Sequence, residues 1–222
     1  MSEGLAGDGL KAAVLAATLN HVPFDGWTKS ALEAGARDAG LPEADAARAF
    51  PGGPAEAAAY HSKLADAAMG PALEALDPAP ERTKEKVAAL IRLRLEGAAS
   101  DREAVRLGLG LLARPQNMPR GLKALASTAD AIWRAAGDRS ADFNWYTKRA
   151  IVSAVYMATV TYWLNDRSPG FEDTWKFLDR RLDDAMKAPM AAKSFLKRAA
   201  TFAPRPGRIA LEMRKRRHAG GW

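Results

Sequence analysis

Apolar residues cover nearly every face of the helix predicted between Asn144 and Leu164. A helix that is apolar all round is a buried one. The pattern breaks at residues 165–167, after which Ser168 can cap a second helix and Pro169 suits its first position, where a missing N–H costs nothing. This second helix is predicted to be amphipathic, because its apolar residues form one stripe: Phe171, Trp175, Leu178, Leu182 and Met186.

Upstream of this pair, apolar residues recur with a helical period in shorter stretches that Gly and Pro separate. We predict helices over 9–21, 29–39, 43–50, 55–76, 81–95, 101–113 and 122–136. The sequence therefore predicts an all-α protein.

The first three of these helices, within residues 1–54, resemble a helix-turn-helix head. A third helix that reads DNA should offer basic or amide side chains to phosphates and base edges. Residues 42–48 instead hold two acids, several alanines and one arginine, and acids repel phosphate. We expect no specific DNA binding, and we interpret the head as degenerate and packed on the helices that follow.

Composition removes several classes of function. A chain of 222 residues, 48% hydrophobic and 27% charged, is long enough for one or two small cores. No run approaches about 18 uninterrupted apolar residues, and the first residues lack the features of an export or transit signal, so we expect a cytoplasmic protein without a spanning helix. There is no cysteine and the three histidines are far apart, so we predict no catalytic residue, no metal site, no cofactor and no enzymatic activity.

The formal charge of +7 is concentrated at the C-terminus. Residues 187–222 hold ten Lys/Arg and one acid, a balance of +9, which leaves −2 for residues 1–186. Residues 190–203 place apolar side chains on one side and basic ones on the other, the pattern of an interfacial membrane helix. We predict that an anionic membrane surface is contacted by Met190, Lys193, Phe195, Leu196, Lys197, Arg198 and Phe202.

The tail also admits two other interpretations. Its helix could fold back onto the body and leave a solvated basic end, or the basic residues could bind nucleic acid. With the tail as a separate part, the predicted domains are a head at 1–54, a bundle at 55–187 and a basic tail at 188–222.

The entrance to the long apolar helix is unusual for a simple helix start. Residues 142–146, Asp-Phe-Asn-Trp-Tyr, place large aromatics beside charged residues. Aromatics mixed with charges at an exposed end are typical of a recognition surface. The alternative is that Trp145 and Tyr146 plug the end of the core.

Two stretches, DFNWYTKR at 142–149 and YWLNDRSPGFEDTWKFLDRRLDD at 162–184, resemble the C-terminal domain of the ubiquinone (coenzyme Q) biosynthesis accessory protein family. The resemblance is strongest over 130–186. It implies a TetR-like helical bundle that binds isoprenoid lipid and the membrane without catalysis, and presents a quinone precursor to the di-iron demethoxyubiquinone hydroxylase. It implies a partner surface built from Asp130, Ile132, Asp142, Trp145, Tyr146 and Arg149.

Small residues are frequent opposite the leucines of these helices, and they permit either close packing or an unfilled channel. The resemblance implies the channel, a long apolar cavity that holds an isoprenoid chain. We predict its walls to include Leu90, Leu107, Leu111, Val155, Val160 and Leu178.

The leading hypothesis is therefore a lipid-presenting accessory protein of ubiquinone biosynthesis, bound peripherally on the inner face of the membrane. We also expect a homodimer. The alternative is a TetR-type regulator whose cavity senses a hydrophobic effector, and salt-dependent binding to duplex DNA would distinguish the two.

Overall fold

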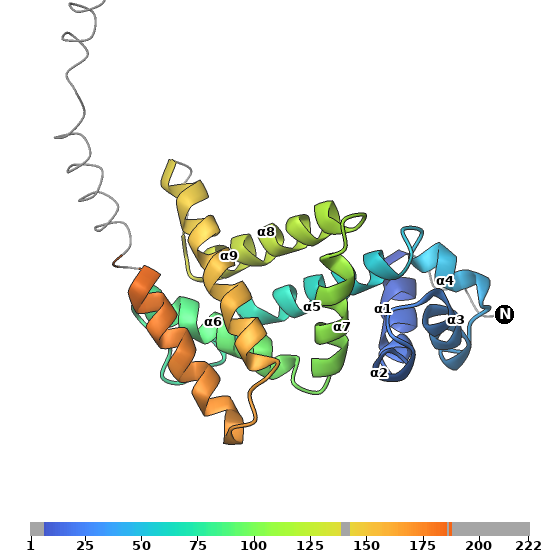
Figure 1. The fold of residues 1–222 in the computed structure, drawn as a ribbon, viewed down its shortest axis with the longest axis horizontal. Helices are drawn as coiled ribbons and strands as arrows, with labels where there is room; N and C mark the ends of the chain where they lie inside the picture. The colour runs from blue at the N-terminus through green and yellow to red at the C-terminus, as the bar shows by residue number, and fades with distance from the viewer. Residues whose placement is uncertain (1–6, 139–142, 186, 188–222) are drawn as a thin grey trace, which may run out of the picture. The chain divides into compact units, whose positions relative to one another are not determined.

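The computed structural model describes residues 7–138, 143–185 and 187, with only the backbone of 143–145. All regular structure in this part of the chain is helical, which confirms the all-α prediction. The chain divides into two compact units, Met1–Arg180 and Arg181–Trp222, and the account below concerns the first. Its helices are α1 (Gly7–Thr18), α2 (Val22–Asp25), α3 (Lys29–Asp38), α4 (Ala44–Ala49), α5 (Pro54–Glu74), α6 (Thr83–Gly97), α7 (Arg102–Leu112), α8 (Met118–Ala135) and α9 (Phe143–Trp163), followed by the 3₁₀ turn η1 (Pro169–Phe171) and helical residues from 172 onward (Figure 1).

Local chemistry accounts for most helix ends. The Thr28 hydroxyl accepts a hydrogen bond from the N–H of Ala31 at 3.1 Å and caps α3, as predicted. Helix α8 begins four residues before the predicted start at Leu122, because Pro119 lies in its first turn, where proline removes no helical hydrogen bond. The short α2 follows α1 directly and was not predicted, since Pro23 indicated only an end.

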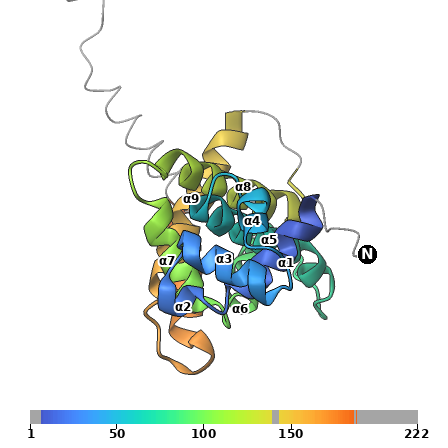
Figure 2. The ribbon, with the colours of Figure 1, turned by 90° about the vertical axis from the view of Figure 1, so that its right-hand side faces the viewer.

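The head, α1 to α4, shares its core with the bundle. Buried Leu10, Leu32 and Phe50 belong to the same apolar cluster as Ala58 of α5 and Leu112 of α7. Figure 2 views the chain from the side of the head, with α3 and α4 in front of α5. Helix α4, the third helix of the predicted helix-turn-helix, holds buried Asp45 in an ion pair with Arg48 at 2.6 Å.

Close approach of α1 and α3 depends on a glycine. A Cβ atom at Gly35 would lie 2.2 Å from the Thr18 hydroxyl oxygen and 2.7 Å from the Thr18 backbone nitrogen. Any side chain at this position would therefore separate the two helices.

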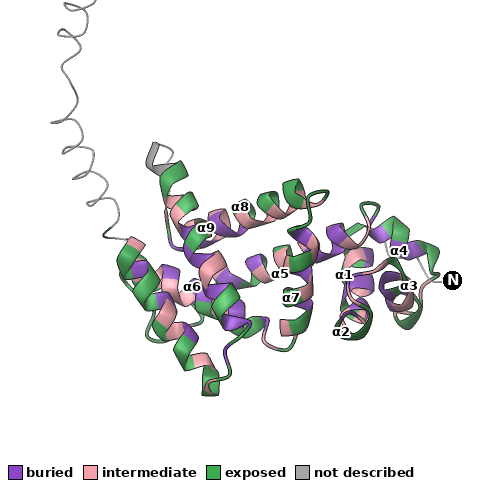
Figure 3. Cartoon of the chain, viewed as in Figure 1, coloured by how far each residue is buried: buried purple, intermediate pink, exposed green. Residues whose placement is uncertain are grey.

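The bundle is organised around α5, which packs against α6, α7 and α8, while α9 packs on α8 and α6. Figure 3 shows the buried positions of α5, α6 and α9 turned toward one another, and the exposed positions turned outward. The prediction that α9 is buried all round holds for only part of it: Val160 and Trp163 are fully enclosed, whereas Tyr146 and Tyr162 are exposed. Tyr162 instead stacks on Phe177, with ring centroids 4.6 Å apart.

Candidate functional site

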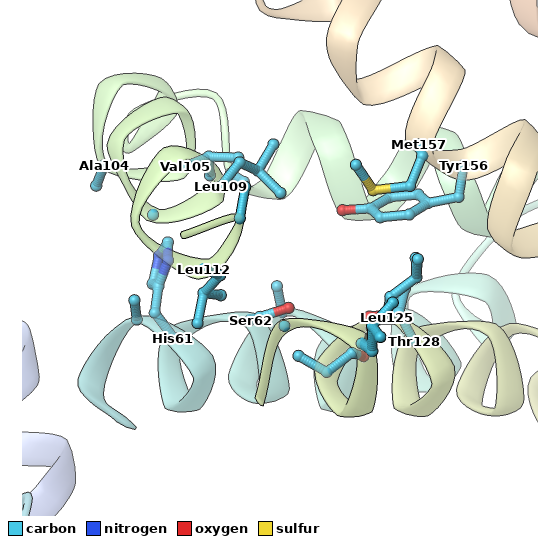
Figure 4. Close-up of a pocket in the computed structure, with 18 of the residues that line it drawn as sticks. His61, Ser62, Ala104, Val105, Leu109, Leu112, Leu125, Thr128, Tyr156 and Met157 are labelled. Atoms are coloured by element: carbon cyan, nitrogen blue, oxygen red, sulfur yellow. Dashed lines mark hydrogen bonds between the residues drawn. The ribbon is translucent and has the colours of Figure 1, made fainter. Parts of the chain in front are cut away.

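An apolar cavity of about 190 Å³ lies among α5, α7 and α8 (Figure 4). Its walls are mainly aliphatic, and the side chains of Val105, Leu109 and Leu112 from α7 face Leu125 of α8 and Met157 of α9. Concave sites with mainly apolar walls and a few polar groups are typical binding sites for small apolar ligands. The cavity can therefore hold a hydrophobic group.

The lining includes two exposed apolar side chains at the start of α8. Met118 is 47% and Leu122 61% exposed, yet both line the cavity. These two residues form an apolar mouth, where the cavity reaches the protein surface.

Small residues at this site serve both roles that the sequence left open. Ala58, Ala65 and Ala124 line the cavity and leave it room. Gly121 also lines it, but a Cβ atom there would lie 2.7 Å from the carbonyl oxygen of Leu112. Gly121 therefore lets α7 and α8 approach each other, while the other small residues leave the space between the helices unfilled.

A buried polar group, which we call the cavity cluster, lies at one end of the cavity. It consists of Ser62, Asp66, Arg94, Thr128 and Tyr156. The Arg94 guanidinium donates from Nε to Asp66 Oδ1 at 2.8 Å, from Nη2 to Ser62 Oγ at 2.7 Å, and from Nη1 to the Tyr156 hydroxyl. The Thr128 hydroxyl donates to Asp66 Oδ1 at 2.9 Å. The cluster thus joins α5, α6, α8 and α9 and supplies the polar part of a mainly apolar cavity.

Burial dominates the electrostatics of the cavity cluster. Only 4% of the Arg94 side chain and 7% of that of Asp66 are exposed. Burial raises the pKa of Asp66 against the opposing effects of Arg94 and Thr128, and burial likewise raises the pKa of Tyr156, so its hydroxyl keeps its proton at neutral pH. His61, elsewhere on the cavity wall, has its pKa lowered by burial despite Asp101, which favours the neutral imidazole.

None of the six residues predicted to form the cavity walls lines this cavity. Leu107 and Leu111 lie on α7 but pack against the core shared with the head. They are each two residues from Val105 or Leu109, which turns a helical side chain by about 200°. The other four are buried within the helical bundle: Leu90, Val155, Val160 and Leu178.

The sequence did contain a signal for the cavity cluster that residue types alone did not reveal. Arg94 lies on the apolar stripe of Val87, Leu90 and Ile91, where a charged side chain must be buried. Asp66 lies three residues before buried Met69 on α5. A charge on an apolar stripe indicates a buried partner of opposite sign.

The structure brings together part of the predicted partner surface. Arg149 of α9 donates from Nε to Asp130 of α8 at 2.8 Å and lies 3.7 Å from Asp138. Tyr146, one turn earlier on α9, is 69% exposed. Ile132 is completely buried and can affect a partner only by supporting the surface above it. Asp142 and the side chain of Trp145 lie outside the described residues.

The second stretch that carries the family resemblance, 162–184, contains a hydrogen-bonded turn between α9 and the next helix, which we call the turn clamp. Arg102 of α7 donates to the carbonyl oxygens of Trp163 and Asp166, and Arg106 donates to that of Leu164. The Asp166 carboxylate accepts hydrogen bonds from the N–H groups of Ser168 at 2.7 Å and Thr174 at 2.9 Å.

These contacts set the ionisation of Asp166. Burial opposes its charged form, but the hydrogen bonds from Thr174 and Ser168 outweigh burial and hold its pKa well below the ordinary value. Ser168, the predicted cap, stabilises the start of the next helix, because its hydroxyl accepts a hydrogen bond from the N–H of Asp173 at 3.1 Å. The clamp therefore ends α9 and starts the next helix.

The seven predicted membrane contacts, Met190 to Phe202, all lie outside the described residues. Within the described part of the chain, no helix is both long and apolar enough to cross a membrane. In the same part, no three His, Asp or Glu side chains are grouped so that they could hold a metal ion.

Comparison with solved structures identifies the fold. The crystal structure of a TetR transcriptional regulator from Nitrosomonas europaea matches with a TM-score of 0.64 and 17% sequence identity, covering 80% of this chain and 98% of that one. At this identity the match shows the fold alone, which is TetR-like, as expected.

Comparison with sequences identifies the family. The COQ9 family model matches residues 118–189. Mitochondrial proteins named ubiquinone biosynthesis protein COQ9 from rat and human are 37% and 36% identical, over 81% and 83% of this chain. The chain spans 60% of the length of each of these relatives, and 70% of the fission yeast relative (Schizosaccharomyces pombe), to which it is 35% identical. The chain belongs to the COQ9 family.

Proposed function

We propose that this protein acts in ubiquinone biosynthesis as a non-catalytic carrier that binds an isoprenoid quinone precursor at the membrane and presents it to the demethoxyubiquinone hydroxylase. The observation that supports this most directly is the apolar cavity with a mouth of exposed Met118 and Leu122. An exposed apolar opening of this kind suits a ligand that arrives from a lipid phase.

The size of the cavity limits how much of the ligand it encloses. A volume of about 190 Å³ is somewhat larger than the cavity of about 150 Å³ that holds benzene. It therefore suits one ring or a short piece of chain, with the rest of an isoprenoid passing through the mouth. Each CH₂ group that leaves water contributes about 0.8 kcal/mol, so the walls alone favour binding.

Charge near the mouth favours an anionic membrane surface. Residues 104–129 contain no Asp or Glu, whereas Arg114 and Lys123 are exposed on either side of Met118 and Leu122. A basic residue near an anionic leaflet contributes about 1 kcal/mol. We infer that the start of α8 faces the membrane and that the protein is peripheral.

The partner surface is proposed to be the end of α8 and the start of α9. Asp130 and Arg149 form an ion pair there, and exposed Tyr146 lies one turn before Arg149 on α9. Exposed aromatic residues beside fixed charges are frequent binding hot spots. Tyr146→Ala should weaken capture of the hydroxylase, whereas Tyr162→Ala, at the other end of α9, should not.

To test the carrier function, a substitution fills the cavity with a larger side chain, and the quinones of the cell are then measured. Ala65→Phe places a ring in the cavity, whereas Ala67→Phe adds the same ring at an exposed position of α5. A strain without the protein should accumulate demethoxyubiquinone, measured by mass spectrometry of membrane lipids. Wild-type protein and Ala67→Phe should correct the profile, and Ala65→Phe should not. A normal profile in the deleted strain would contradict the proposed function.

A further inference from the structure

The cavity cluster contains two hydroxyl groups, and no described residue accepts a hydrogen bond from either of them. Arg94 donates to both the Tyr156 hydroxyl and Ser62 Oγ. A guanidinium has only donors, so both hydroxyl oxygens must accept these bonds. Among the described residues, neither hydroxyl has an acceptor for its own hydrogen, although both residues line the cavity. Arg94 therefore leaves two O–H donors available to a ligand (Figure 4).

The charge of the cluster is already balanced. Asp66 lies 2.8 Å from Arg94, and both side chains are almost completely enclosed. An anionic ligand group would add a second negative charge beside Asp66 in a buried site, which is unfavourable. A neutral oxygen that accepts hydrogen bonds meets no such cost.

We propose that Tyr156 and Ser62 form a subsite for a neutral acceptor oxygen, a carbonyl or ether of the ligand's head group, while the aliphatic walls take the rest of the enclosed part. This rests on the proposed carrier function and specifies which end of the ligand is inside. The ring binds at the cavity cluster, and the isoprenoid tail leaves past Met118 and Leu122.

The position of the subsite on α9 connects it with the partner surface. Tyr156 follows Arg149 by seven residues, which is two turns on the same helix face and about 10 Å along the axis. Thr128 of the cluster likewise precedes Asp130 by two residues on α8. A head group at Tyr156 is thus held close to the residues proposed to meet the hydroxylase.

The test compares three small prenyl probes on the full-length protein by isothermal titration calorimetry. They are ubiquinone with one isoprene unit, a prenylated benzene without oxygen, and dimethylallyl phosphate as the anion. Tyr156→Phe and Ser62→Ala each remove one hydroxyl and keep Arg94 and Asp66. Each should weaken quinone binding about fivefold, since a neutral hydrogen bond has this order of effect, and leave the hydrocarbon unchanged. Tyr162→Phe, on the same helix but away from the cavity, is the matched control.

A second measurement does not depend on the stability of the variants. The infrared carbonyl stretch of ¹³C-labelled quinone should shift to lower frequency on binding to wild type, and part of this shift should be lost in Tyr156→Phe or Ser62→Ala.

An equal loss of quinone and hydrocarbon affinity, with no change in the carbonyl band, would show a structural role and overturn the subsite. Tyr156-dependent binding of the phosphate probe would overturn its preference for neutral groups. Hydrocarbon binding without any preference for the quinone would reject the subsite alone, whereas no binding of any probe would reject the carrier function as well.

Discussion

The cavity cluster and the turn clamp each combine arginine with a buried aspartate, but Arg94 of the cavity cluster is buried, whereas Arg102 of the clamp is half-buried and Arg106 is exposed. The hydrogen bonds of the two clusters also go to different kinds of group. In the clamp, Arg102 and Arg106 donate to backbone carbonyls, and Asp166 accepts from backbone N–H groups. In the cavity cluster, Arg94 and Asp66 bond mainly to side chains, and among the described residues two of these side chains have no acceptor for their own O–H. Polar side chains that hydrogen-bond to backbone groups connect one helix to the next. Polar side chains that hydrogen-bond to other side chains can position those side chains to bind a ligand.

The two clusters also differ in how visible they are in the sequence. The clamp draws most of its groups from one stretch, 163–174, the same stretch that carries the family resemblance. The cavity cluster takes single residues from positions 62, 66, 94, 128 and 156. The most recognisable motif of this sequence therefore forms a structural turn. The polar residues of the cavity, in contrast, lie far apart along the chain.

The largest expected effect is the loss of the buried cation. Arg94→Met leaves Asp66 enclosed without its ion pair and should lower the free energy of unfolding by about 3–5 kcal/mol. Urea denaturation followed by circular dichroism measures this. Arg92→Met, which removes a surface pair with Glu96 on the same helix, should cost about 1 kcal/mol or less. Adding Asp66→Leu to Arg94→Met should recover stability, and a cost no larger than that of Arg92→Met would contradict this account of the pair.

A smaller effect with a distinct pH dependence is expected in the clamp. Asp166→Asn should lower the free energy of unfolding by about 2 kcal/mol at neutral pH, because charge-assisted bonds to Ser168 and Thr174 are lost. The folded pKa of Asp166 lies below its unfolded value, so its contribution is complete above about pH 4 and is lost as the pH falls toward the folded pKa. The difference in the free energy of unfolding between the wild type and Asp166→Asn should therefore become smaller as the pH falls.

The matched control for this prediction is Asp173→Asn in the same turn. Asp173 is exposed and its carboxylate lies 3.6 Å from Lys176. This variant should change stability by a few tenths of a kcal/mol. If the difference in the free energy of unfolding between wild type and Asp166→Asn stayed constant between pH 7 and pH 3, the charge of the carboxylate would not be the cause of the stability difference.

The fold followed from the sequence because apolar periodicity and helix breakers act locally. The periods predicted α1 and α3 to α9 with shifts of a few residues at their ends, and Thr28 takes the predicted cap position. Pro169 was predicted at the first position of the helix after α9, but it begins the 3₁₀ turn η1, and the helix starts at residue 172. The main difference at a boundary, the start of α8, depends on whether Pro119 ends a loop or begins a helix. Proline suits both, so only packing decides.

The site was less accessible to sequence reasoning for a physical reason. Whether a leucine of α7 faces the head or the cavity depends on which helices lie on each side, and Leu107 and Leu109 are equally apolar. The partner residues Asp130 and Arg149 were named from the resemblance, and the structure places them in contact. Ser62 has no feature in the sequence that separates it from other exposed-looking serines, because its role comes from Arg94 on another helix.

The smallest effect on stability, but a clear effect on loading, is expected at the mouth of the cavity. Leu122→Asp replaces an exposed side chain and should change the free energy of unfolding by about 0.5 kcal/mol or less. It also removes apolar contact and adds an acid where the membrane is proposed to lie, so transfer of a dansyl-labelled farnesyl probe from phosphatidylcholine–phosphatidylglycerol vesicles should slow about tenfold. Leu64→Asp, an exposed leucine of α5 that does not line the cavity, should leave transfer unchanged. Because both variants add the same charge, equal slowing would indicate a general electrostatic effect, and slowing only at Leu122 would place the lipid entrance at the start of α8.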